Sequence, residues 1–188
     1  MATIRRRIGN LVSVGTSLFK LSVIKMFHFK NLKFRMIERL SPDVVVDVDR
    51  KSNIELGDRI SIHSGGRISA VEGGQLILHR NTSLNVRCII ACHYKIEIGE
   101  NVSIGPNVMI FDHDHVMKAG EGVKNSEYQL DEIIIGNNTW IGAGAIILKG
   151  THIGDNCVIA AGSIVKGDIP DGTVLIQKRE NTYLKVKE

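Results

Sequence analysis

An aliphatic side chain recurs at every sixth position through the second half of this 188-residue chain. The longest unbroken run has six members, which are Ile135, Ile141, Ile147, Ile153, Ile159 and Val165. A small residue often follows each of them, and a second lies four positions later in five of the six repeats. Period six suits neither an amphipathic helix nor a simple alternating strand. It predicts a parallel β-helix, in which each hexapeptide forms one side of a coil.

The same spacing appears earlier, between residues 54 and 110, and then stops before Ile133. The interruption contains a polar segment, residues 116–132, which we expect to be a loop extruded from one coil. A long loop inside a regular repeat is usually functional. The sequence therefore predicts an all-β fold in which residues 41–170 form a β-helix of about six coils.

The segment before the repeat has a different character. Its apolar residues follow a helical period, so residues 1–40 predict one or two helices. Residues 1–39 hold nine basic side chains and one acidic side chain, a net charge of +8, whereas the rest of the chain has a net charge of −4. Residues 171–188 predict a C-terminal tail. Because the positive charge gathers at one end, we expect no nucleic-acid surface spread over the fold.

Composition excludes other classes of protein. Aromatic residues make up 5% of the chain, which argues against stacking platforms for single-stranded nucleic acid. The three cysteines include no CxxC pair, so we expect a reducing compartment. The sequence shows neither a signal-peptide pattern nor a run of about 18 uncharged apolar residues, so we expect a cytoplasmic protein.

The stretch IGNNTWIGAGAIILKGTHIGDNCVIAAGSIV, from Ile135 to Val165, resembles the left-handed β-helix acyltransferases. The chain is most similar to the galactoside, maltose and polysaccharide O-acetyltransferases, over roughly residues 76–170. The resemblance implies a left-handed coil and a homotrimer with active sites between neighbouring chains. It also implies acetyl-CoA as co-substrate, no bound metal, and a sugar hydroxyl as the acceptor in surface polysaccharide biosynthesis.

The same resemblance implies a catalytic histidine in the segment IGPNVMIFDHDHVM, just before the loop. His115 stands at the family's spacing, and His113 is the competing candidate. Histidine titrates near neutral pH, so it suits the deprotonation of an acceptor hydroxyl that attacks the thioester. The alternative is a histidine at the loop edge that is bonded to Asp112 or Asp114.

A catalytic base needs an orienting partner, and Asp112, Asp114 and Glu127 are available. The resemblance favours Glu127, which is otherwise a solvated loop carboxylate. It also implies that Asn85, 30 residues before His115, contacts the acceptor or the acetyl group, although Asn is common in turns.

Cys92 and His93 depart from the family pattern. The related enzymes carry acidic sugar-binding residues eight positions after the Asn that corresponds to Asn85. We therefore expect Cys92 and His93 to line a different acceptor pocket.

The acetyl-CoA site follows from the resemblance as well. Trp140 is implied beside the cofactor, and the backbone N–H of Ala143 is implied to face the thioester oxygen, where it would stabilise an oxyanion. Small residues would let the pantetheine arm approach, although close packing of coils also needs them. The expected contacts are Trp140, Gly142, Ala143, Ala160, Ala161, Gly162, Lys166, Lys178 and Arg179.

Three other functions remain open from the sequence. A sugar N-acetyltransferase would use the same base and oxyanion donor. A zinc enzyme of the γ-carbonic anhydrase type could use His79 and His115, but its third ligand would fall at Gly120. A non-catalytic β-helix would need no histidine, tryptophan or loop at one place.

Residues 1–40 also allow two interpretations. In the first, the apolar side packs on the β-helix. In the second, residues such as Phe19, Phe27 and Phe29 lie in the membrane surface at the inner face, and Arg5–Arg7 with Lys20, Lys25, Lys30 and Lys33 meet anionic headgroups.

Overall fold

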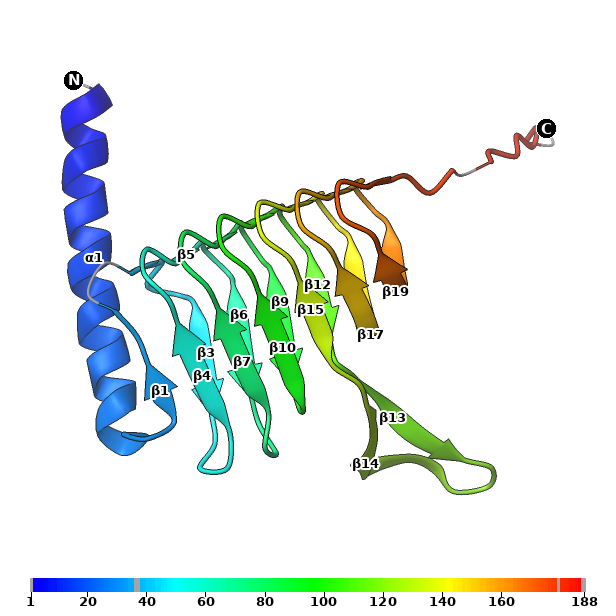
Figure 1. Cartoon of the computed structure of the whole chain (residues 1–188), viewed down its shortest axis with the longest axis horizontal. Helices are drawn as coiled ribbons and strands as arrows, with labels where there is room; N and C mark the ends of the chain where they lie inside the picture. The colour runs from blue at the N-terminus through cyan, green and yellow to red at the C-terminus, as the bar shows by residue number, and fades with distance from the viewer. Residues whose placement is uncertain (1, 36–37, 179, 187–188) are drawn as a thin grey trace.

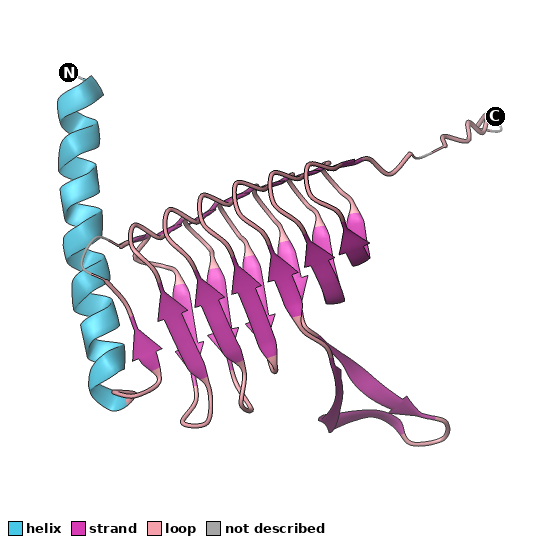
Figure 2. Cartoon of the chain, in the orientation of Figure 1, coloured by secondary structure: helices cyan, strands magenta, loops and turns pink. Residues whose placement is uncertain are grey.

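The computed structural model is a three-sided parallel β-helix of about six turns with one helix at its N-terminal end (Figures 1 and 2). The structure describes residues 2–35, 38–178 and 180–186, without the side chains of residues 2–11 and 124–126. The all-β class, the parallel coils and the helical N-terminal segment predicted from the sequence are confirmed.

Parallel strands stack into three faces. Face 1 contains β1 (Leu32–Lys33), β4 (Asn53–Leu56), β7 (Gln75–Leu78), β10 (Lys95–Ile98) and β15 (Ile133–Ile135). Face 2 contains β2 (Arg39–Leu40), β5 (Ser61–Ile62), β8 (Ser83–Leu84), β11 (Ser103–Ile104), β16 (Trp140–Ile141), β18 (Val158–Ile159) and β20 (Val174–Leu175). Face 3 contains β3 (Val45–Val48), β6 (Arg67–Ala70), β9 (Ile89–Cys92) and β12 (Met109–Phe111). The long strands β17 (Ile146–Ile153) and β19 (Ile164–Ile169) begin on face 3 and end on face 1.

Each coil turns three corners, which we name by their residues. The Ala143 corner leads from face 2 to face 3 and comprises residues 41–44, 63–66, 85–88, 105–108, 142–145 and 160–163. The histidine corner leads from face 3 to face 1 and comprises residues 49–52, 71–74, 93–94, 112–132 and 148–150. The asparagine corner leads back to face 2 and comprises residues 57–60, 79–82, 99–102, 136–139 and 154–157.

The six-residue spacing places an aliphatic side chain of every short side in the core. Ile98 pairs with Leu78 on one side and with Ile135 on the other, and all three are buried. Small residues recur because the coils stack directly upon one another. A Cβ added to Gly142 would lie 2.5 Å from the Ala161 backbone nitrogen and 2.7 Å from the Ile159 oxygen. Gly142 is therefore required by coil stacking alone.

The asparagine corner is fixed by a ladder of four side chains. Its members have φ between 54° and 60°, the left-handed region that Asn tolerates better than most residues, and they are Asn81, Asn101, Asn138 and Asn156. Their amides are linked in series at 2.9, 3.1 and 3.3 Å. The ladder holds successive coils in one register.

Helix α1 (Ala2–Phe27) covers the N-terminal end of the solenoid. Leu21 is fully buried, and the backbone N–H of Leu40 donates to Ser17 Oγ at 2.7 Å. The buried Glu38 carboxylate accepts a hydrogen bond from the Ile60 N–H at 2.6 Å, and burial raises the pKa of Glu38 to about 7.

Two boundaries differ from the sequence prediction. Parallel pairing begins with Leu32 opposite Ile54, so the solenoid starts before residue 41 and the N-terminal segment holds one helix. The extruded segment is an antiparallel hairpin of β13 (His113–Lys118) and β14 (Gly122–Leu130), which starts earlier than the expected loop 116–132. The pairs across this hairpin mix polar and apolar residues, and the hexapeptide pattern carries no signal for it.

Candidate active site

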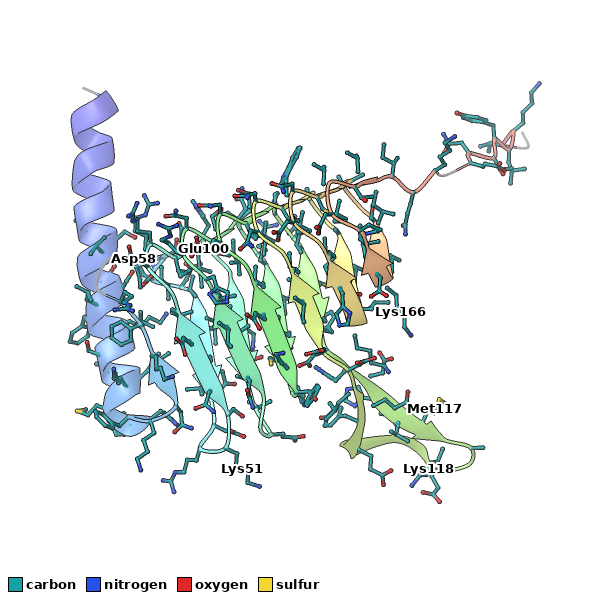
Figure 3. The ribbon with its side chains drawn as sticks, in the orientation of Figure 1. Lys51, Asp58, Glu100, Met117, Lys118 and Lys166 are labelled. Carbon is teal, nitrogen blue, oxygen red and sulfur yellow. The ribbon has the colours of Figure 1, made fainter. Side chains whose placement is uncertain are left out.

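Three histidines and a tyrosine gather where the hairpin leaves the solenoid. We call His93, His113, His115 and Tyr128 the histidine cluster. The ring centroids of His93 and His113 are 3.8 Å apart, and that of Tyr128 lies 4.5 Å from His93 and 5.0 Å from His115. The cluster forms because β9 and β12 end side by side and His115 pairs with Tyr128 across the hairpin. Figure 3 shows the hairpin, marked by Met117 and Lys118, projecting from the solenoid.

The Asp112 carboxylate fixes this corner from within. It is fully buried and accepts hydrogen bonds from the backbone N–H groups of His93, at 2.9 Å, and Tyr94, at 2.8 Å. His113 Nδ1 lies 3.1 Å from Asp112 Oδ1. A buried carboxylate in this position orients the imidazole that it contacts. Asp112 therefore orients His113.

His93 is nearly buried beside His113, with 12% of its side chain exposed. Its Nδ1 lies 3.6 Å from Glu72 Oε2, which is an ion-pair distance beyond the range of a hydrogen bond. Burial, and next the neighbouring His113, lower the pKa of His93, while Glu72 and Asp112 oppose the shift. We infer that a neutral His93 ring packs on His113 at neutral pH.

His115 is exposed, so its ring can reach a bound molecule. Glu127 is adjacent to Tyr128 in β14, and successive side chains of a strand point to opposite faces. The Glu127 carboxylate pairs with Lys118 Nζ at 3.1 Å, and Asp114 lies 3.7 Å from Lys149. Within the described residues, neither carboxylate is placed as the orienting partner of His115 that the sequence suggested.

Asn85 and Trp140 share a hollow of about 220 Å³ beside the Ala143 corner. Trp140 stands in β16 between Ser103 and Val158 of the neighbouring strands, with 57% of its surface exposed. Asn85 Oδ1 accepts a hydrogen bond from the Val86 N–H at 2.8 Å, which gives the Asn a turn-forming role at the edge of the same hollow.

Ala143 lies in the exposed turn after β16. Among the residues that the structure describes, none accepts a hydrogen bond from the Ala143 N–H. One coil further on, the Gly162 N–H donates to the Ala143 oxygen at 2.8 Å, so the small residues Ala160 and Ala161 lie beside it. An available backbone donor in an open row of small residues fits a thioester oxygen. The residues present at this corner therefore fit acetyl-CoA.

The two halves of the expected site lie at different corners of one chain. Asn85 and Ala143 stand before the strands of face 3, and the histidine cluster stands after them. Strand β9 alone spans four residues, roughly 13 Å of extended chain. A reaction that uses both corners therefore needs the Ala143 corner of one chain and the histidine corner of another.

Several expected contacts are placed elsewhere. Cys92 is fully buried in the core, and burial followed by the Asp112 carboxylate raises the pKa of its thiol, so the expectation that Cys92 lines the acceptor pocket is wrong. Lys166 is exposed on β19, at the end of face 3 away from the Ala143 corner (Figure 3). Lys178 is exposed in the tail, and Arg179 lies outside the described residues.

Tyr128 and Glu72 are site residues that the sequence reasoning missed. Tyr128 is the one aromatic residue in the polar segment 116–132, which could have drawn attention to it. Glu72 lies one coil before its contact His93 and carries no such signal. For the metalloenzyme alternative, His79 contacts Glu97 at 2.9 Å at the asparagine corner. No group of three or more His, Cys, Asp or Glu in the described part of the chain is placed to hold a metal ion.

Comparisons with known proteins agree with the fold. The bacterial transferase hexapeptide (six repeats) family matches residues 132–167. Galactoside O-acetyltransferase of Escherichia coli (strain K12) is 43% identical over 102 residues, which cover 54% of this chain. The chain spans 50% of the length of that relative.

A solved structure and a second relative extend the match. A galactoside acetyltransferase in complex with coenzyme A is 31% identical, with a TM-score of 0.51, over 81% of this chain and 62% of that one. Galactoside O-acetyltransferase of Lactococcus lactis subsp. lactis (strain IL1403) is 32% identical over 144 residues, which are 76% of this chain and 68% of the relative. With that coverage, the chain belongs to the hexapeptide-repeat acetyltransferases.

Proposed function

We propose that the protein is an acetyl-CoA-dependent O-acetyltransferase that acetylates a sugar hydroxyl in surface polysaccharide biosynthesis, in the cytoplasm. The observation that carries the proposal is the pair of complementary corners on one solenoid. One corner offers an available backbone donor among small residues beside an exposed tryptophan, and the other offers an exposed histidine. The relatives named above, which are galactoside O-acetyltransferases, support a sugar acceptor.

The chemistry needs one base and one oxyanion donor. His115 accepts the proton of the acceptor hydroxyl, and the hydroxyl oxygen forms a bond to the carbonyl carbon of the thioester. The Ala143 N–H donates to the oxygen that becomes negative in the tetrahedral intermediate. The carbon–sulfur bond then breaks, and the proton held by His115 passes to the departing sulfur. The products are the acetylated sugar and free coenzyme A.

We propose that three chains assemble side by side to join the two corners. The separation of the Ala143 corner from the histidine cluster by face 3 supports this assembly. In each site, one chain supplies His115 and Tyr128, and its neighbour supplies Asn85, Trp140 and Ala143. Three equivalent sites follow from cyclic symmetry.

His93, which stands where the resemblance implies acidic sugar-binding residues, lies with its ring centroid 3.8 Å from that of His113. Aromatic rings offer a flat apolar surface on which a sugar ring can pack. Tyr128 stands against the same pair. We propose that this surface selects an acceptor other than a simple galactoside.

The test is an acceptor screen with acetyl-CoA in which the release of free thiol is measured. The panel contains nucleotide sugars, lipid-linked sugars and free oligosaccharides, each with a matched amino sugar. We expect thiol release with at least one hydroxyl acceptor. Transfer to amino sugars alone would identify an N-acetyltransferase, and failure to bind any acyl-CoA would leave a non-catalytic β-helix.

A further inference from the structure

Helix α1 has two opposite faces. Ser17 and Leu21 are buried against the solenoid. On the opposite side, large apolar residues recur at a spacing of seven, and two more follow at the end of the helix. We call these five residues the outer face, and their exposed fractions are 60% for Val12, 75% for Phe19, 71% for Met26, 72% for Phe27 and 74% for Phe29. A monomeric chain rarely exposes so many large apolar residues together, so the outer face marks an interaction surface.

The segment that carries the outer face is basic, since residues 1–37 contain eight basic residues and no acidic residue. Lys30 is exposed near the end of the helix, and the Lys25 ammonium lies 6.0 Å from the centre of the Phe29 ring. Lys33 is also exposed, but it pairs with Glu55 at 3.0 Å. Lys20 serves the fold instead, because its ammonium donates to the carbonyl oxygens of Pro42 and Val44.

We propose that helix α1 lies in the plane of an anionic membrane surface, with the outer face in the interface and the flanking cations on the headgroups. Apolar side chains along one helix face with basic residues beside them are the features of an interfacial helix. A second copy of the same face would bring basic residues of one helix against those of the other, which disfavours self-association. No helix in the described part of the chain is long and apolar enough to span a bilayer, so an in-plane position is the one that fits.

The same contact brings the histidine corner close to the membrane. The turn after α1 rests on this corner, because Asn31 Nδ2 donates to the oxygens of Ser52, at 2.6 Å, and Arg50, at 3.2 Å. Figure 1 shows the C-terminal end of α1 and the hairpin along the same edge of the solenoid. His93 and Tyr94 precede β10, three strand spacings from β1, or about 14 Å. Helix α1 lies between β1 and the membrane and is about 10 Å across, so the cluster stands roughly 24 Å from the surface. A saccharide carried on a membrane lipid must extend over that distance to reach the cluster, a consequence that rests on the proposed function.

The test is sedimentation of the full chain with vesicles of phosphatidylcholine, with and without phosphatidylglycerol. The outer-face variant carries Phe19→Ser, Phe27→Ser and Phe29→Ser. A matched control changes three equally exposed apolar residues of the C-terminal tail, as Ile176→Ser, Tyr183→Ser and Leu184→Ser. Circular dichroism of both variants verifies that they are folded.

We expect the full chain to bind the anionic vesicles at low salt and to leave them as salt screens the charges. The outer-face variant should bind the vesicles about tenfold more weakly, or not at all. The control variant should bind like the unaltered chain. The proposal is overturned if the full chain ignores anionic vesicles, or if both variants behave alike. It is also overturned if the outer-face variant binds vesicles like the unaltered chain but has a lower molar mass in light scattering. In that case the outer face joins copies of the chain. A chain that binds vesicles but transfers no acetyl group would keep this inference and contradict the proposed function.

Discussion

The Ala143 corner and the histidine corner bound the same face of the solenoid but follow different rules. At the Ala143 corner, turns of successive coils are similar in length, and small residues stack at van der Waals distance. At the histidine corner, the connection between faces is two residues after β9, four after β6 and 21 after β12. The repeat therefore builds a rigid row at one corner, and chemistry that differs between relatives can enter at the other.

The difference also assigns the roles in catalysis. The regular corner offers backbone groups, which any sequence of small residues supplies. The irregular corner offers titratable side chains, which single residues supply. Loss of a single titratable side chain should therefore damage activity most at the histidine corner, and added bulk at a stacked glycine should damage stability at the Ala143 corner.

The largest effect is expected at the irregular corner. His115→Ala should lower kcat by about 100-fold or more, because the general base is lost, with little change in acetyl-CoA affinity. His113→Ala should lower kcat less, because the His113 ring is packed between Asp112 and His93 and serves to support the cluster. Steady-state kinetics with the acceptor found in the screen measure both. If the two effects are reversed, His113 is the base.

Mixed trimers test directly whether the two corners meet between chains. If the two corners meet only between chains, His115→Ala and Asn85→Ala proteins complement each other when they are unfolded and refolded together. Random mixing at equal amounts should restore roughly one quarter of the unaltered activity, because half of the histidine corners and half of the Ala143 corners are intact. Light scattering should show a homotrimer throughout. Mixtures no more active than the separate variants would contradict a shared site.

The scaffold was predictable from the sequence to a greater extent than the site. Aliphatic residues six apart predict coils because each short side buries the aliphatic residue of the series, and Ile98 between Leu78 and Ile135 confirms this prediction. The hairpin could not be located as well, since pairs such as His115 and Tyr128 are set by an excursion that the repeat does not encode. Asp112 was one of three candidate carboxylates, and only its burial identifies it as the partner of His113.

The burial of Cys92 shows why individual site residues were misplaced. The family spacing puts Cys92 and His93 at the acceptor, but alternate residues of β9 point inward and outward. Cys92 fills the core, and His93, the next residue, reaches the surface cluster. If the register of β9 had been known to within one residue, the sequence would have assigned Cys92 to the core and His93 to the surface.

At the Ala143 corner, Gly142→Ala should destabilise the fold by about 1–3 kcal/mol, the usual cost of forcing atoms into a packed site. The added methyl group would meet backbone atoms of Ala161 and Ile159, which cannot rotate away. The matched substitution Ala161→Ser, at an exposed position of the same corner, should stay within about 0.5 kcal/mol of the unaltered protein. Denaturant unfolding measures both. Equal stability of the two variants would contradict close stacking as the reason for glycine.

The smallest effect concerns the pH dependence of stability at the histidine corner. Burial and the neighbouring His113 lower the pKa of His93 in the folded chain, so the ring stays neutral there at a pH at which the unfolded chain already binds a proton. Because the unfolded state binds more protons, the free energy of unfolding falls as pH drops through and below about 6.5, the ordinary pKa of histidine.

His93→Gln removes this dependence. The difference in Tm between the unaltered protein and His93→Gln should therefore shift in favour of the variant between pH 7.5 and pH 5.5, whatever its value at pH 7.5. His63→Gln, which replaces an exposed histidine at the Ala143 corner, is the matched control over the same range. A constant difference in Tm for His93→Gln would mean that His93 accepts its proton as readily in the folded chain as in the unfolded one.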